Sequence, residues 1–337
     1  MRAFAYQRAA DASAAVQALG ATGAGVAPTD AAVQVLAGGT TLIDLMKLDV
    51  MRPGTVIDIN PLAREWSQIV AADGHLRLGA LARMADVAAD PEVQRSYPLV
   101  ADSLKLAASA QLRNMATLGG NVLQRTRCSY FRDVSYANCN KRNPGSGCAA
   151  IEGFNRAHAV LGTSEQCIAT YPGDFAQALI ALDANVDVVG PSGRRSLPFA
   201  QLHRPPGATP QLETTLAPNE LISGFAIAGR WPRSIFLKVR DRQSYEFALA
   251  SAAVALDVQD GVVRKARVAL GGLATVPWRA REAEAVLDGA RFDDALAERA
   301  ADAAFAGAIP RKDNAFKIAL GKHVVARALH QAAAMEI

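Results

Sequence analysis

The chain has 337 residues, of which 50% are hydrophobic and 20% are charged, and its formal net charge is +4. At roughly 150 residues per domain this length predicts two domains, or three small ones, with enough apolar residues for sizeable cores. Charges of both signs are mixed along the chain, which excludes a disordered solvating protein, and the weak net charge excludes a nucleic-acid-binding chain.

The N-terminal segment carries no export signal that we can identify. Arg2 and Arg8 are present, but Asp11 and Gln17 lie where the apolar region of a secretory signal belongs, so we expect an amphipathic helix over residues 1–20. No apolar stretch reaches the ~20 residues that a membrane span requires. The sequence alone therefore predicts a cytoplasmic chain without a membrane span, and export would need a partner that carries the signal.

Apolar spacing in the first third of the chain alternates between strand and helix periods. The predicted strands are 33–37, 55–59, 68–70 and 75–78, the last two joined by a turn at Asp73-Gly74. The predicted helices are 42–46, 82–89 and 98–110, and Pro91 separates the last two.

The middle of the chain is richer in turn residues. We expect a loop at 117–121, no packed element at 138–147, a helix at 175–182 with Asp174 as its N-cap, and a strand at 186–189. After about residue 230, strands are predicted at 235–239, 248–258 and 262–270, and helices at 278–287, 295–306 and 315–334. Strands followed by helices indicate a small α+β domain at the C-terminal end.

Two Gly-Gly motifs are candidates for binding phosphate. The first is Ala37-Gly38-Gly39-Thr40-Thr41 and the second is Thr117-Leu118-Gly119-Gly120-Asn121. Glycines let backbone N–H groups approach an anion, and the adjacent hydroxyls can donate to phosphate oxygens. Either motif alone is more typical of a tight turn, but the two together could clamp one pyrophosphate. Neither matches a Walker loop or a Rossmann fingerprint.

The four cysteines, Cys128, Cys139, Cys148 and Cys167, lie in one short segment. The segment has none of the Cys-x2-Cys pairs that zinc sites use, and it holds a single histidine, His158, where a Rieske centre needs two. A glycine- and proline-rich loop with four thiolates suits a [4Fe–4S] cluster. The spacing alone leaves three interpretations open, with a cluster favoured over two disulfides and zinc third.

Lys238 lies in the predicted strand 235–239. A lysine in a strand most often faces solvent, although one beside a redox ring can hydrogen-bond a ring carbonyl. No Ser/His/Asp triad and no paired carboxylates stand out, so no catalytic residue is predicted.

In combination these motifs resemble a known family. The order is Ala37-Gly38-Gly39-Thr40, then Arg113-Asn114-Met115-Ala116 leading into the second Gly-Gly motif, then Asp174 heading a helix, then Phe236-Leu237-Lys238-Val239-Arg240. This order resembles the FAD-binding medium subunits of the xanthine dehydrogenase, or molybdenum hydroxylase, family. The resemblance covers nearly the whole chain.

The resemblance implies an α+β protein with two domains. The first, 1–228, would be a two-lobed FAD-binding domain of the vanillyl-alcohol-oxidase (PCMH) type, interrupted by a cysteine loop at 124–168. The second, 229–337, would be the small C-terminal domain of carbon monoxide dehydrogenase flavoproteins.

The resemblance also assigns residues to FAD. The pyrophosphate would be held by Ala37, Gly38, Gly39, Thr40, Thr41 and Leu42 and by Thr117, Gly119, Gly120 and Asn121. Ser109 would be a further contact, and Leu161 would approach the cofactor through its main chain. Asp174 would reach the ribose of the adenosine half, and Lys238 would lie near the flavin ring.

The cysteine loop resembles the subgroup found in bacterial periplasmic aldehyde oxidoreductases. That likeness implies a [4Fe–4S] cluster on Cys128, Cys139, Cys148 and Cys167. It further implies a heterotrimer in which a molybdopterin subunit oxidises an aldehyde to a carboxylic acid, a [2Fe–2S] subunit relays electrons, and this chain passes them to an external acceptor. Export with a signal-bearing partner would place the complex in the periplasm.

Several alternatives stay open at this stage. The chain could be the medium subunit of a xanthine dehydrogenase or hydroxybenzoyl-CoA reductase type enzyme. It could be a non-redox assembly module with structural zinc, or a standalone flavin oxidase, although no covalent flavin tether is identifiable. The aldehyde preference and the acceptor (O2, quinone, ferredoxin or NAD) are not encoded in recognisable motifs.

Overall fold

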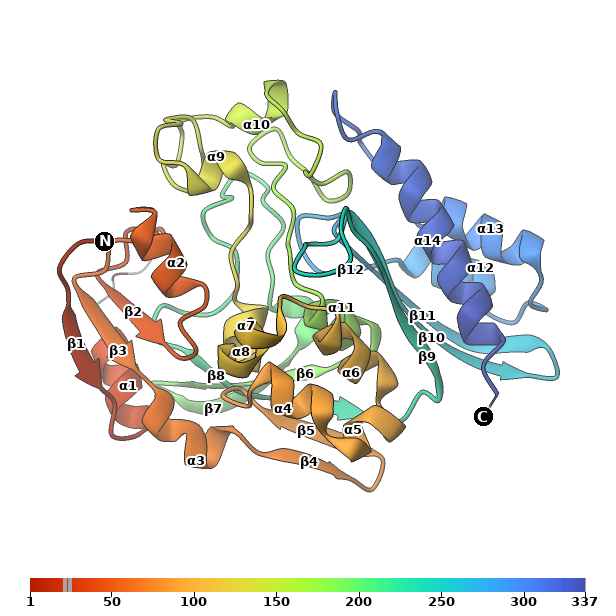
Figure 1. Ribbon diagram of the computed structural model, residues 1–337, viewed down its shortest axis with the longest axis horizontal. Coiled ribbons are helices and arrows are strands. Elements are labelled where there is room, and N and C mark those ends of the chain that lie inside the picture. The colour runs from red at the N-terminus through yellow and green to blue at the C-terminus, as the bar shows by residue number, and fades with distance from the viewer. Residues whose placement is uncertain (21–22, 24–25, 337) are drawn as a thin grey trace.

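The computed structural model describes residues 1–20, 23 and 26–336, and within them the strands form three sheets (Figure 1). The first sheet is small and parallel, in the order β1 (Ala5–Arg8), β3 (Thr55–Asp58), β2 (Val33–Leu36). Helix α1 (Ala12–Leu19) buries its apolar stripe beside this sheet, and α2 (Leu42–Lys47) follows the first Gly-Gly motif. The strands at 33–37 and 55–59 and the helix at 42–46 are thus confirmed.

The expected helix over 1–20 is wrong in its first half. Residues Ala5–Arg8 form β1, whose four residues are all exposed, and only Ala12–Leu19 is helical with Asp11 as N-cap. Strand β1 exists because its backbone pairs with β3, some 50 residues away, and local spacing carries no sign of that pairing.

The second sheet is antiparallel, in the order β4 (Ile69–Ala72), β5 (His75–Gly79), β8 (Leu221–Ala228), β6 (Asn185–Gly190), β7 (Gly193–Pro198). The hairpin at Asp73-Gly74 is confirmed, and the strand predicted at 186–189 is β6. Strands β7 and β8 were not predicted. The central strand β8 joins two parts of the chain more than 100 residues apart.

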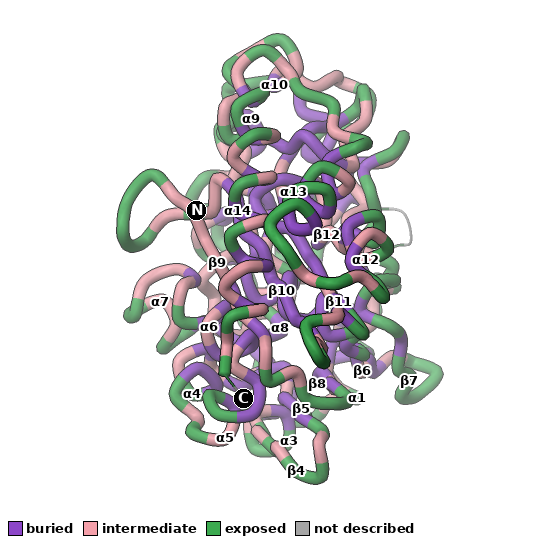
Figure 2. Tube along the Cα trace, turned by 90° about the vertical axis from the view of Figure 1, so that its right-hand side faces the viewer, coloured by how far each residue is buried: buried purple, intermediate pink, exposed green. Residues whose placement is uncertain are grey.

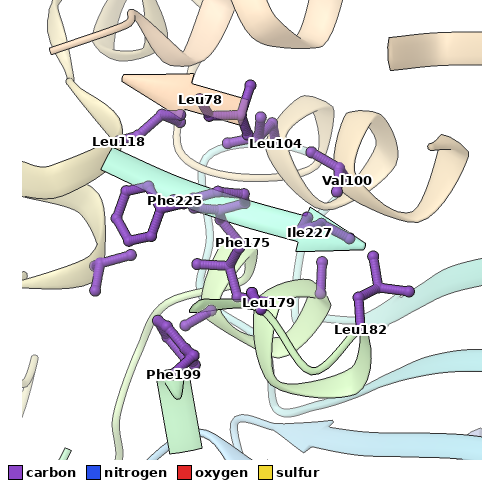
Figure 3. Packing of buried hydrophobic residues seen from close by; sticks show 14 of the residues in the cluster. Leu78, Val100, Leu104, Leu118, Phe175, Leu179, Leu182, Phe199, Phe225 and Ile227 are labelled. Atoms are coloured by element: carbon purple, nitrogen blue, oxygen red, sulfur yellow. The ribbon is translucent and has the colours of Figure 1, made fainter. Parts of the chain in front are cut away.

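Helices α4 (Met84–Ala89), α5 (Pro91–Ser96), α6 (Pro98–Lys105) and α11 (Phe175–Ala181) contribute to one core with this sheet. Figure 3 shows that core, in which the rings of Phe175 and Phe225 meet edge to face with centroids 5.8 Å apart. The predicted helix 98–110 ends at Lys105, because Ala108 takes a left-handed backbone conformation with φ 49°. A separate helix, α7 (Ala110–Met115), begins after Ser109.

The third sheet is antiparallel, in the order β12 (Trp278–Arg279), β11 (Val262–Gly271), β10 (Ala250–Gln259), β9 (Arg233–Val239). Helices α12 (Arg281–Leu287), α13 (Asp294–Ala303) and α14 (Phe316–Ala333) pack on one face (Figure 1). Its other face contributes Phe236, Ala253, Ala255 and Ala269 to the core of the second sheet. The central strand β10 is therefore buried over most of its length, as the colouring of Figure 2 shows, whereas the edge strands β9 and β12 are largely half-buried. The predicted C-terminal strands and helices are confirmed, except that residues 278–279 are strand.

Two further expectations need correction. The motif predicted as a loop at 117–121 is the start of a helix, α8 (Leu118–Val122), because the Thr117 side chain accepts from Gly120 N and caps it. Asp174 occupies the N-cap position of α11 but makes no capping hydrogen bond, because its carboxylate pairs with Lys238 instead.

The cysteine segment crosses between the domains with little regular structure. Its helices α9 (Ser129–Arg132) and α10 (Ala149–Glu152) are single turns, and no helix or strand forms at 138–147, as predicted.

The remaining short elements lie outside the cysteine segment. Three-residue 3-10 turns occur at Asn60–Leu62 and Phe199–Gln201, and α3 covers Ala63–Trp66. No helix in the described part of the chain is long and apolar enough to span a membrane.

Candidate functional site

A cavity of about 530 Å³ brings the two Gly-Gly motifs together. Its wall includes Ala37, Gly38, Gly39, Thr40, Thr41, Leu42, Thr117, Gly119 and Gly120. The motifs are about 80 residues apart in sequence, and they meet because one follows β2 and the other follows the α4–α7 helices.

The first motif is tightly packed against the second. A Cβ atom added at Gly38 would lie 2.1 Å from the carbonyl oxygen of Met115, so only glycine fits there. Gly39 takes φ +75°, a conformation that glycine adopts without strain. In the described part of the chain, the N–H groups of Gly39, Thr40 and Thr41 have no backbone acceptor. These amides are therefore available to an anion in the cavity.

The second motif supplies a helix start at the same cavity. Gly119 N donates to Ala80 O at 2.8 Å, which fixes the loop against the second sheet. Thr117 Oγ1 accepts from Gly120 N at 3.3 Å and keeps its own proton to donate. Asn121 does not line the cavity, and its side-chain oxygen is buried without a hydrogen-bond partner among the described residues.

Five of the predicted FAD contacts lie outside this cavity wall, namely Asn121, Ser109, Leu161, Asp174 and Lys238. Ser109 caps α7 through Leu112 N at 3.3 Å. Leu161 is 1% exposed and packs in the core of the C-terminal domain, with its N–H on Leu273 O. Asp174 and Lys238 pair with each other at 2.6 Å, and both are buried. Side chains in contact with each other reach the same part of a ligand. The resemblance places Asp174 at the ribose of adenosine and Lys238 at the flavin ring. Both roles hold together only if FAD folds back on itself.

The Asp174–Lys238 pair also organises the backbone near Ser109. Lys238 Nζ donates to Leu106 O at 3.0 Å, and Arg240 donates to the same oxygen at 3.1 Å. Burial raises the pKa of Asp174, and the attraction of Lys238 partly offsets that rise. Lys238 is therefore not on a solvated face, which was the expectation for a lone lysine in a strand.

The structure adds residues to the cavity wall that no sequence motif predicted. Tyr171, His203, Leu221 and Ile222 line the wall, as does Glu213. His203 donates from Nε2 to Val122 O at 3.2 Å, and burial lowers its pKa to about 4, so its ring is neutral. These residues come from separate segments, and sequence spacing gives no sign that they meet.

All four cysteines line a second, smaller cavity of about 10 Å³. None forms a disulfide, and Cys139 pairs with Cys148 through a backbone bridge. Within the described residues, no three His, Cys, Asp or Glu side chains are arranged to close on a metal ion. The four sulfurs thus share one site, with no disulfide and no closed metal cage among the described residues.

The sulfurs differ in their surroundings. Burial raises the pKa of Cys128 to about 12, and His158 Nε2 lies 3.2 Å from its sulfur. Cys167 donates to Cys148, which lowers the pKa of Cys148 and raises that of Cys167. Backbone N–H groups also point at the sulfurs, including Ala169 N at 3.4 Å from Cys167.

Ion pairs and buried polar groups hold the cysteine segment to both domains. Arg127 and Arg132 reach Asp44 on α2 at 3.2 and 2.7 Å. On the opposite side, the buried Lys317 of α14 donates to His158 O at 3.1 Å. The segment is thus attached to α2, which follows the first Gly-Gly motif, and to the C-terminal domain.

The three sheets and the Gly-Gly cavity define an FAD-binding domain followed by a flavoprotein C-terminal domain. Residues 2–227 match the FAD-binding domain of molybdopterin dehydrogenases, and residues 235–332 match the C-terminal domain of carbon monoxide dehydrogenase flavoproteins. The chain belongs to the FAD-binding medium subunits of the molybdenum hydroxylase family, and it is an oxidoreductase subunit.

Individual relatives agree with this assignment. The aldehyde oxidoreductase FAD-binding subunit PaoB of Escherichia coli is 45% identical over 99% of both chains. The carbon monoxide dehydrogenase medium chain of Hydrogenophaga pseudoflava is 28% identical over 89% of this chain and 88% of its own. The solved carbon monoxide dehydrogenase of that organism superposes with a TM-score of 0.75 over 98% of this chain and 97% of its own.

Proposed function

We propose that this chain is the FAD and [4Fe–4S] electron-transfer subunit of a heterotrimeric, molybdenum-dependent aldehyde oxidoreductase. The observation that carries the proposal is the convergence of four free cysteines on one cavity that adjoins the Gly-Gly cavity. The full-length similarity to an aldehyde oxidoreductase subunit supports the aldehyde as substrate of the complex.

The chain's own part is to bind and orient FAD. Free amides at Gly39, Thr40 and Thr41 would hold the diphosphate, together with the capped start of α8. FAD, when bound, takes up electrons singly and releases them in pairs. We keep Ser109, Asn121, Leu161, Asp174 and Lys238 as proposed contacts, of which Asp174 and Lys238 would approach one and the same part of the cofactor.

The donor set suits a cluster more than a single ion. Four thiolates with backbone N–H donors are the ligation that iron–sulfur clusters use. The segment also lacks the Cys-x2-Cys pairs that structural zinc sites use. The present space holds about one water, so the loop must open to admit a cluster.

The partners and the compartment follow from the same proposal. A large molybdopterin subunit would oxidise the aldehyde, a small [2Fe–2S] subunit would connect it to this chain, and an external acceptor would take the electrons. We propose a periplasmic location reached through a partner's signal. Deletion of that signal should leave this chain in the cytoplasm, and unchanged periplasmic recovery would contradict co-export.

An absorption spectrum of anaerobically purified protein tests the function. We expect flavin bands over a broad shoulder that dithionite bleaches, with about four irons and four sulfides per chain. Cys148→Ser should lose the iron and keep FAD, whereas Ser135→Ala, on the same segment but away from the cysteine cavity, should keep both. Zinc without sulfide would contradict the cluster and leave an assembly module, and absence of flavin would contradict the electron-transfer role.

A further inference from the structure

The wall between the two cavities contains a buried charge cluster that the family motifs do not account for. Arg125 Nε lies 2.6 Å from Glu213 Oε2, and Lys141 Nζ lies 2.9 Å from Glu213 Oε1. The side chains of Arg125 and Lys141 are 6% and 10% exposed. Burial raises the pKa of Glu213, but the two cations outweigh burial and leave that pKa below its ordinary value. Two cations thus share one carboxylate, and the cluster carries one excess positive charge.

Among the described residues, no other acid on the cavity wall balances this excess. Glu220 also lines the cavity, but both of its carboxylate oxygens accept from Arg195 at 2.7 Å. Within the described residues, Nη1 and Nη2 of Arg125 are buried without a hydrogen-bond partner, and the guanidinium stacks on Phe131 at 4.9 Å. A buried cation with unmatched donors is costly unless an anion compensates it.

An anionic ligand bound in the cavity would compensate this positive charge. Arg125 and Lys141 line the same cavity as the free amides of Gly39 and Thr40. The diphosphate is the anionic part of FAD, and Arg and Lys are the usual cationic partners of phosphate. Both cations come from the cysteine segment, since Arg125 precedes Cys128 and Lys141 lies between Cys139 and Cys148.

We propose that Arg125, supported by Lys141, supplies the positive charge that binds the FAD diphosphate, so that the inserted cysteine segment forms part of the FAD site. The proposal rests on FAD binding by this chain. Lys141, Cys167 and Ala169 line both cavities, so the cysteine site and the FAD site share a wall.

The test compares ligands with and without phosphate. Apoprotein is prepared from the full chain, and FAD binding is followed by flavin fluorescence, with ADP and adenosine as displacing ligands. Arg125→Met should weaken FAD and ADP by about 10- to 100-fold, the range for a hydrogen bond to a charged group. Adenosine binding should stay unchanged, and Arg125→Lys should restore part of the affinity for ADP.

Arg156→Met is the matched control. Arg156 lies in the same segment, and its side chain is 40% exposed and paired with Asp241 away from the cavity. We expect wild-type binding of FAD, ADP and adenosine in this variant. Circular dichroism and thermal unfolding of each apoprotein establish that the variants are folded.

Three results would overturn the proposal. Equal weakening of ADP and adenosine by Arg125→Met would make Arg125 a packing residue of the wall, and unchanged ADP binding would exclude any role for its charge. Failure of the wild-type chain to bind FAD would overturn the FAD function as well. If the wild type binds FAD and Arg125→Met binds FAD and ADP as tightly as the wild type does, only this inference is overturned.

Discussion

The absence of a side chain at Gly38 lets the two Gly-Gly motifs approach each other closely at the cavity. A Cβ at this position would lie 2.1 Å from Met115 O, and that oxygen belongs to rigid backbone just before the second motif. Because the contact is with backbone, the clash cannot be relieved by a rotamer change. The close approach of the two motifs therefore depends on this glycine.

We expect Gly38→Ala to destabilise the protein by about 1–3 kcal/mol, the usual cost of overpacking, and to lower its FAD content. Urea unfolding and the flavin absorbance of the purified protein measure the two effects. Gly54→Ala is the control, because an added Cβ there meets only Ala32 O at 3.8 Å. Equal effects of the two substitutions would contradict the steric explanation.

Lys317 is a buried lysine whose amine donates to backbone carbonyls, including Gly272 O at 2.6 Å and His158 O at 3.1 Å. Burial lowers its pKa from 10.5 to about 7. Between these values the unfolded chain holds a proton that the folded chain has released. The free energy of unfolding should therefore rise with pH in this window by about 1.4 kcal/mol per unit, and be independent of this group below it.

The prediction is that this rise disappears in Lys317→Met. Urea unfolding of the wild type and the variant from about pH 6 to 9.5 measures the difference between the two slopes. Lys322→Met, on the exposed face of the same helix and paired with Asp302 at 2.9 Å, should keep the wild-type slope. Parallel curves for the wild type and Lys317→Met would show that Lys317 does not titrate in this range.

At the scale of elements, α8 links capping to ligand binding. The helix has five residues, so its start depends on Thr117 Oγ1 accepting from Gly120 N. Its first turn carries Gly119 and Gly120, which line the cavity. The residues that first suggested a loop are a helix start because the threonine satisfies an N–H group that the helix leaves free.

Thr117→Ala should cost about 1 kcal/mol of stability through loss of the cap and should also weaken FAD binding. Thr117→Ser keeps the hydroxyl and should behave like the wild type in both respects. Thermal unfolding of apoprotein and a fluorescence titration with FAD separate the two effects. A stable Thr117→Ala variant with unchanged FAD affinity would exclude the cap from both roles.

At the scale of the whole molecule, the two domains share a core. Phe236 of β9 is 4% exposed and packs with residues of the second sheet, while the opposite face of the third sheet packs under α12–α14. The cysteine segment adds ion pairs to α2 on one side and Lys317 contacts on the other. The domains are thus joined by apolar burial as well as by the chain.

We expect one cooperative unfolding transition, seen alike by far-ultraviolet circular dichroism and by tryptophan fluorescence, to which the buried Trp66 contributes. Phe236→Ala should lower the stability of the whole transition by about 3–5 kcal/mol, since it opens a cavity in the shared core. Two separate transitions in the wild type would contradict this coupling.

Local sequence was sufficient for the parts of the fold whose cause is local. The Asp73-Gly74 hairpin and the long C-terminal helix were predicted because turn chemistry and apolar spacing act between neighbouring residues. The clustering of four cysteines was likewise visible in the chain. These features need no knowledge of the distant partner.

Other features arise only when distant segments meet. Strand β1 is exposed along its length and β8 lies between strands from far parts of the chain, so pairing decides them. The carboxylate of Asp174 does not cap α11, because a buried carboxylate is stabilised by pairing with the buried amine of Lys238. The charge cluster of Arg125, Lys141 and Glu213 exists for the same reason. Burial makes such pairings strong, and it depends on how the whole chain closes around them.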